Sequence, residues 1–77
     1  SPFETFNTDF GLVALNVERI VAVRDRTDRA GTKVEICSSD SAGGIIVNHS
    51  LESVLRLIEL KNREVAMSKS RILWEKE

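Results

Sequence analysis

Residues 43–58 change their hydrophobic periodicity from that of a strand to that of a helix. Two glycines lead into the apolar run 45–47, and the polar triplet 48–50 interrupts it. Ser50 stands where its hydroxyl can accept a hydrogen bond from a free N–H in the first helical turn. The segment therefore predicts a last strand that leads directly into a helix packed on a sheet. The apolar residues at helical spacing are Leu51, Val54, Leu55 and Ile58.

The residues before this switch predict several short strands. Residues 3–6 and 12–15 are predicted to form a hairpin, because Asn7, Thr8 and Asp9 between them are turn-forming residues. Residues 16–19 predict a tight turn or one helical turn. Residues 32–37 alternate apolar and polar side chains, as a half-buried strand does.

Residues 20–23 form a strand whose two faces are both apolar. Three of the four residues are β-branched, which favours strand over helix. Ile20 and Ala22 are expected on one face, and Val21 and Val23 on the other. Such a strand either lies at the centre of the sheet or places its second face against another subunit.

The helix has no sequence signal that ends it before the C-terminus. No proline or glycine follows Gly44. A helix over residues 51–77 would be ~40 Å long, whereas strands of about five residues span only ~17 Å. We therefore predict an α+β fold: a small, mainly antiparallel sheet of four to five strands followed by one long C-terminal helix. The compact part is expected to be residues 1–60, with residues 61–77 as a helical extension.

The small size of the chain predicts a partner. A core built by 77 residues supplies only ~3–5 kcal/mol, and chains of this size often add disulfides, a metal or a second subunit. Cys37 is the single cysteine, so an internal disulfide is excluded. One cysteine and one histidine, His49, cannot supply the three or four ligands of a zinc site. Homo-oligomerisation is the remaining option.

Neither His49 nor Cys37 predicts catalysis. His49 is interpreted as a turn or capping residue before the helix, and Ser50 as a cap and not a nucleophile. Cys37 lies on the outer face of its strand, without a nearby charge to activate the thiol. We therefore predict no catalytic residue, no cofactor and no metal, and a protein that is not an enzyme.

The charge balance gives no general attraction to nucleic acid or to a membrane. Eleven basic and twelve acidic residues leave a formal net charge of -1. No apolar run is long enough to cross a bilayer, and no signal peptide is visible. Together with the lone thiol, this pattern predicts a cytoplasmic protein.

Oligomer contacts are expected from the apolar second face of the 20–23 strand and from the helical extension. Trp74 is the single tryptophan, and two apolar residues precede it near the end of the chain. Such a cluster marks either a partner surface or a tail that folds back on its own domain. The residues expected in the contacts are Val21, Val23, Val65, Ile72, Leu73 and Trp74.

The alternative hypothesis is a small transcriptional regulator that binds nucleic acid. Its basic side chains would come mainly from the loop over residues 24–29, where aspartates alternate with arginines and no aromatic residue is available for base stacking. The residues of this alternative surface are Arg24, Arg26, Arg29 and Lys33.

The order of these features resembles the flagellar and swarming motility protein family, the FlbD-like proteins. The resemblance covers roughly residues 11–60, and it implies a non-enzymatic accessory factor of bacterial motility. The aromatic residues 3–10, the arginine-rich loop and the C-terminal extension depart from the family pattern. The resembling residues are Leu15, Asn16, Ile20, Val23, Thr32, Val34, Ile36, Gly43, Gly44, Val47 and the run Ser50-Leu51-Glu52-Ser53-Val54.

Overall fold

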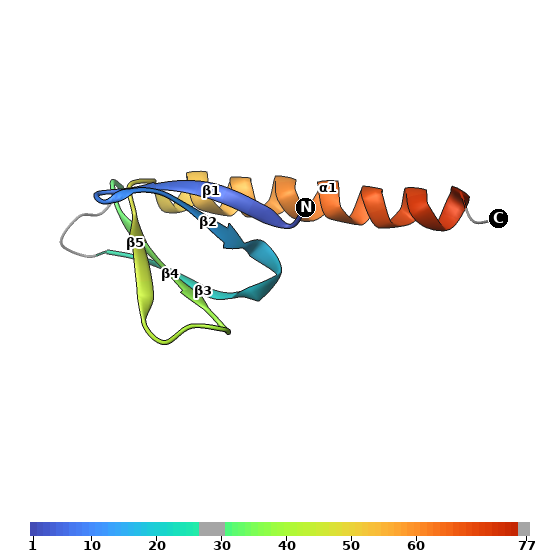
Figure 1. The fold of residues 1–77 in the computed structure, drawn as a ribbon. Coiled ribbons are helices and arrows are strands. Elements are labelled where there is room, and N and C mark those ends of the chain that lie inside the picture. Colours follow the sequence, from blue (N-terminus) through green and yellow to red (C-terminus); the bar gives the residue numbers. More distant parts are fainter. Residues whose placement is uncertain (27–30, 76–77) are drawn as a thin grey trace.

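Five strands, a 3₁₀ turn and one long helix make up the fold (Figure 1). The structure, a computed structural model, describes residues 1–26 and 31–75, and within these ranges the side chains up to residue 70. Chain order is β1 (Phe3–Thr8), β2 (Gly11–Asn16), η1 (Val17–Arg19), β3 (Ile20–Asp25), β4 (Val34–Ser38), β5 (Gly44–Val47) and α1 (Leu51–Glu75).

The five strands divide into two antiparallel sheets. β1 and β2 form a hairpin in which Phe3 lies opposite Asn16 and Thr8 opposite Gly11. The second sheet has the order β3-β4-β5, so β4 is its central strand. The predicted α+β fold with one C-terminal helix is thus confirmed, with the strands in two sheets. Of the two alternatives for the 20–23 strand, the central position is excluded, because β3 lies at an edge.

A β-bulge in β3 decides which of its side chains face the core. The register with β4 shifts between Ile20 and Ala22, so Val21 is the extra residue. Ile20 and Val23 both pack against the core, whereas the side chain of Val21 is 68% exposed. The prediction that Val21 and Val23 share an outward face is therefore wrong, because simple alternation does not continue through a bulge.

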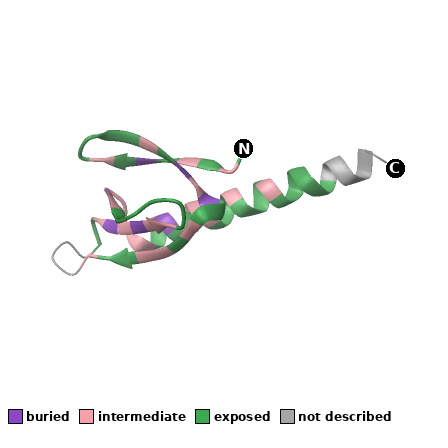
Figure 2. Ribbon diagram, turned by 60° about the horizontal axis from the view of Figure 1, so that its bottom comes forward, coloured by how far each residue is buried: buried purple, intermediate pink, exposed green. Residues whose placement is uncertain are grey.

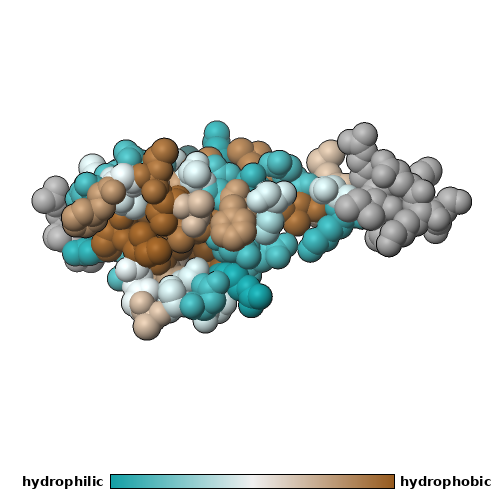
Figure 3. Space-filling model, in the orientation of Figure 1, coloured by the Kyte–Doolittle hydropathy of each residue, from teal (hydrophilic) through white to brown (hydrophobic). Residues whose placement is uncertain are grey.

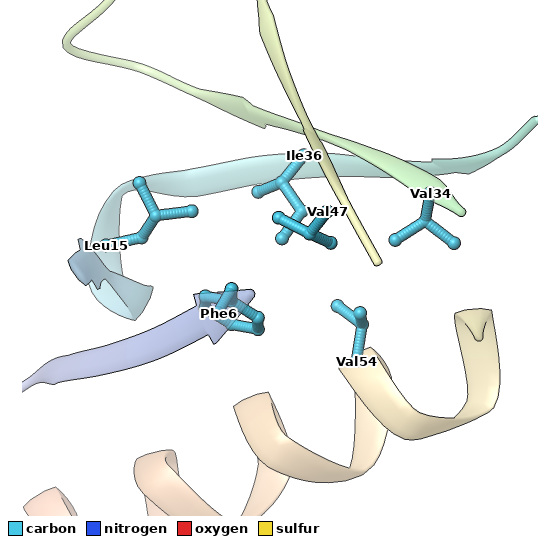
Figure 4. Packing of buried hydrophobic residues seen from close by; sticks show 6 residues of the cluster. All are labelled: Phe6, Leu15, Val34, Ile36, Val47 and Val54. Atoms are coloured by element: carbon cyan, nitrogen blue, oxygen red, sulfur yellow. The ribbon is translucent and has the colours of Figure 1, made fainter. Parts of the chain in front are cut away.

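The core lies where the hairpin, the three-stranded sheet and the first turns of α1 meet (Figures 2 and 4). Phe6 of β1 is fully buried and contributes the largest side chain. Val13, Leu51, Leu57 and Ile58 cover the edge of the cluster. Helix and sheets therefore depend on one small cluster, whose members are Phe6, Leu15, Val34, Ile36, Val47 and Val54.

The helix begins as the sequence predicts. The Ser50 hydroxyl accepts a hydrogen bond from the Ser53 N–H at 3.1 Å, and the Ser50 carbonyl accepts one from the Val54 N–H at 3.0 Å. Such a cap stabilises a helix by about 1 kcal/mol. Val54 then points into the core at the first turn.

Ion pairs connect the sheets to the helix beyond the core. Lys61 lies 3.7 Å from the Glu4 carboxylate in β1, and Lys69 lies 3.4 Å from Glu18 in η1. Figure 1 shows α1 continuing past both sheets, which fits a longest dimension of 52 Å against 24 and 21 Å for the other two. Residues 51–75 thus form one continuous helix, a continuity that the sequence pattern allowed but left open.

Candidate interaction surface

The turn between β1 and β2 is built by local hydrogen bonds and holds a fully exposed aromatic side chain. The Thr8 hydroxyl donates to the Gly11 carbonyl at 2.7 Å and accepts from the Phe10 N–H at 3.1 Å. Gly11 has a φ of 109°, which favours glycine at this position. The Phe10 side chain is 100% exposed. A turn of this kind does not require an aromatic residue, so the folding of the hairpin does not explain Phe10.

Phe10 lines an apolar groove between the hairpin and β5. The groove has a volume of about 530 Å³. Leu12, on its hairpin side, is 76% exposed. Figure 3 shows hydrophobic surface gathered over the hairpin and β5 in this view. The residues that line the groove are Thr8, Asp9, Phe10, Leu12, Val13, Gly44, Ile45 and Ile46.

A polar network joins the hairpin turn to the end of β5. Lys33 Nζ lies 2.9 and 2.8 Å from the two carboxylate oxygens of Asp9, and it donates to the Asn48 side-chain oxygen at 2.6 Å. The Asn48 side-chain amide donates to Asp9 at 3.0 Å. The Asn48 backbone N–H donates to the carbonyl of Asn7 at 2.7 Å. These bonds hold the hairpin beside the C-terminal end of β5.

His49 adds a second connection at the same place. Its Nε2 accepts a hydrogen bond from the Asn7 N–H at 3.0 Å. The imidazole also meets the Phe6 ring edge to face, with 5.7 Å between ring centroids and 88° between planes. His49 lies in the bend between β5 and α1, as predicted, and its two contacts with Asn7 and Phe6 in addition hold β1 against this segment.

β5 forms one edge of the three-stranded sheet and carries no charged side chain of its own. Its residues are Gly-Ile-Ile-Val, and they pair with β4 on one side. Among the described residues, the backbone bond nearest to its other side joins Asn48 to Asn7, beyond the end of the strand. Ile45 and Ile46 are both half-buried and line the groove. The groove therefore includes an open strand edge.

The neighbouring charges on the outer face of the sheet are paired. The Glu35 side chain lies across Gly44, where a Cβ atom would collide with it. The Arg24 guanidinium lies 3.6 Å from the Glu35 carboxylate, and it also donates to Cys37 Sγ at 3.3 Å. Cys37 thus lies on the outer face, as its strand position predicts.

The structure separates the residues predicted for oligomer contacts. Val21 is exposed at the bulge of β3, Val23 packs on the core and Val65 is half-buried on α1. Ile72, Leu73 and Trp74 belong to the helical backbone, but their side chains lie outside the described residues.

The residues of the alternative nucleic-acid surface do not form an uncompensated basic patch within the described part of the chain. Lys33 is paired with Asp9, and Arg24 faces Glu35. The Arg26 N–H donates to the Lys33 carbonyl at 3.3 Å, which joins the residue just after β3 to the residue just before β4. Arg29 lies outside the described residues.

Comparisons of the chain with known protein families, with curated proteins and with solved structures find no match. In the described ranges, no three or more His, Cys, Asp or Glu side chains gather as a metal site would require. The described part of α1 lacks the length of apolar sequence needed to cross a bilayer. The proposed function therefore rests on the geometry of the groove and of the β5 edge.

Sequence reasoning missed the groove and its two most exposed residues. One signal was present: Phe10 stands between Asp9 and Gly11, at a turn position where small polar residues are usual. Leu12 gave no such signal, because an apolar residue in a hairpin strand is ordinarily expected to face the core. Only the placement of the hairpin beside β5 shows that Leu12 faces outward.

Proposed function

We propose that this chain is a non-enzymatic protein-interaction module that works as a homo-oligomer. The observation that carries the proposal is the apolar groove, with Phe10 and Leu12 exposed on one side and the open edge of β5 on the other. Exposed apolar surface concentrated at one place is typical of contact sites between proteins.

The dimensions of the chain support the same proposal. Its accessible surface is 5630 Å², whereas a compact monomer of 8.6 kDa exposes about 4,700 Å². Its radius of gyration is 14.2 Å, against about 11.5 Å for a compact chain of this length. The projecting helix and the open groove both contribute to this extra surface, and a partner would cover part of it.

Of the two surfaces, the groove is the more apolar. Residues of α1 beyond the core expose mostly charged and polar side chains. Leu60 and Met67 are exposed apolar exceptions, and they lie seven positions from each other. In the groove, by contrast, apolar residues from β2 and β5 adjoin one another. The helix contacts expected from Val65 and residues 72–74 remain a second part of the proposed assembly.

Sedimentation analysis of the full chain tests this proposal. We expect a concentration-dependent dimer or higher oligomer in the micromolar range. A well-folded monomer at every concentration up to about 100 μM, more than enough to populate an interface of micromolar Kd, would overturn it. Circular dichroism on the same samples checks that the chain is folded.

We further propose a cytoplasmic setting, with accessory work in bacterial motility as the family resemblance implies. The single free thiol, Cys37, fits a reducing compartment. The motility role predicts that the gene lies among flagellar genes and that its deletion changes swarming without removing an enzymatic activity. Normal swarming of the deletion strain would remove the motility role and leave the interaction module standing.

A further inference from the structure

The two edges of the three-stranded sheet are protected to different degrees. β3 carries Arg24 and Asp25 and contains a bulge, two of the devices by which natural sheets prevent pairing with other chains. β5 has no charged residue, and its recorded pairing with β4 shows no register shift. An apolar, unbulged edge that is left open in this way is suited to pairing with another strand.

The charges around the groove indicate what kind of strand fits. Asp9 is paired with Lys33, and Glu35 with Arg24, so the charged side chains at either end of β5 are already compensated. A charged segment would find no free counter-charge among these four residues. The suitable occupant is therefore an uncharged, apolar strand.

β5 itself has that chemistry, with the sequence Gly-Ile-Ile-Val. Antiparallel pairing of one edge with its own copy satisfies two-fold symmetry, the commonest arrangement of soluble oligomers. A second copy of the chain therefore presents the uncharged, apolar strand that this edge accepts.

We propose that β5 pairs edge to edge with β5 of a second copy, which joins two three-stranded sheets into one of six strands. With a two-fold axis normal to the sheet, the core-facing sides of the two three-stranded sheets lie on the same side of the six-stranded sheet. Ile45 of both copies then lies on the core-facing side. There, Phe10 and Leu12 of each hairpin cover the strand contributed by the other copy. This inference rests on the proposed homo-oligomer and names the surface that forms it.

A pair of double variants tests the surface. Phe10→Asn with Leu12→Thr removes the exposed apolar side chains, and both replacements suit a turn and a strand. Leu60→Gln with Met67→Gln is the matched control, since it removes two exposed apolar side chains from α1 and keeps good helix formers. Sedimentation equilibrium measures the dissociation constant of the dimer. The groove variant should raise this constant at least about tenfold, and the control should leave it unchanged.

Hydrogen exchange on the unmodified chain provides a measurement that does not depend on any variant folding. As the concentration rises through the dimerisation range, the β5 amides that face away from β4 should become protected. Amides of β3 should not change. Isotope-filtered NMR on a mixture of labelled and unlabelled chains should show contacts between Ile45 side chains of different copies.

The outcomes separate this inference from the function on which it rests. If the unmodified chain stays monomeric, the proposed homo-oligomer fails, and the β5 contact fails with it. If the chain assembles but β5 exchange does not respond to concentration, only the β5 contact is overturned. If Leu60→Gln with Met67→Gln dissociates the oligomer and the groove variant does not, the β5 contact is also overturned, and the assembly is assigned to α1.

Discussion

The two edges of the three-stranded sheet are built differently, although both come from short apolar runs. β3 begins with Ile20, Val21, Ala22 and Val23, and β5 contains Ile45, Ile46 and Val47. In β3 a bulge turns Val21 outward, and charged residues follow directly. In β5 the strand stays regular, and the hairpin supplies apolar walls beside it. An edge can therefore be closed by irregularity and charge, or kept open where pairing is useful.

The largest expected effect comes from Phe6, which holds the hairpin wall of the groove against the sheet. Phe6→Ala should lower the free energy of unfolding by about 3–5 kcal/mol, because it leaves a cavity at the centre of a small core. Urea unfolding at fixed protein concentration measures the change, since assembly alters apparent stability.

Phe3→Ala is the matched control for Phe6, because it removes the same side chain from the same strand at a position 52% exposed. Its cost should be well under half that of Phe6→Ala. Equal costs for the two variants would contradict the view that the hairpin is held to the sheet through Phe6.

The second prediction compares the two edges directly. Ile46→Lys places a charge on the open edge and should weaken self-association at least about tenfold. Val21→Lys places the same charge on the bulged edge and should leave self-association unchanged. Sedimentation velocity over a dilution series measures both. The reverse result would move the contact to β3 and support the contacts expected there from Val21.

The third prediction concerns the polar network of Lys33, Asp9 and Asn48 beside the groove. Lys33→Met keeps most of the apolar stem but removes the ammonium group that bonds to Asp9 and Asn48. Since the Lys33 side chain is only 18% exposed, the loss should be about 1 kcal/mol. Thermal unfolding measures it, and exchange of the Asn48 amide should become faster.

Lys69→Met is the comparison for Lys33→Met. Lys69 pairs with Glu18 at 3.4 Å, with the two side chains 70% and 44% exposed. Such a pair contributes close to nothing, so this variant should unfold at nearly the same temperature as the parent chain. A larger loss for Lys69→Met than for Lys33→Met would mean that the contact of α1 with η1 contributes more to stability than the polar network beside the groove.

The fold was predictable where residue pattern and local chemistry agree. The apolar spacing after Ser50 and the capping hydroxyl predicted both the existence and the start of α1, and the absence of later glycine or proline allowed a long helix without fixing its continuity. The hairpin followed from turn residues between two apolar runs. These signals act within a few residues of one another, so the sequence alone contains them.

The candidate site was not predictable, because it depends on residues far apart in the chain. Lys33, Asp9 and Asn48 belong to three different segments, and no local pattern indicates that they meet. Successive side chains of a regular strand point to opposite faces, and the residues around Val21 were assigned to faces by this rule. The bulge at Val21 breaks the alternation. Leu12 and Ile45 line one groove only because the hairpin lies beside β5.

The smallest expected effect is that of Gly44→Ala, which tests how closely Glu35 lies across the open edge. A Cβ at this position would meet the Glu35 side chain, which would have to rotate away and weaken its pair with Arg24. That exposed pair contributes little, and alanine restricts the unfolded chain by about 0.4–1 kcal/mol relative to glycine. The net change in unfolding free energy should therefore stay within about 1 kcal/mol.

The Glu35→Ala background provides the control for Gly44→Ala. With the Glu35 side chain removed, the added Cβ meets no obstacle from it, so Gly44→Ala should become neutral or slightly stabilising. A double-mutant cycle measured by urea unfolding gives the coupling between the two positions. If the two effects simply add, Glu35 does not limit Gly44. If the two effects are coupled, the Glu35 side chain lies against the otherwise apolar edge of β5. Glu35→Ala alone should leave self-association intact.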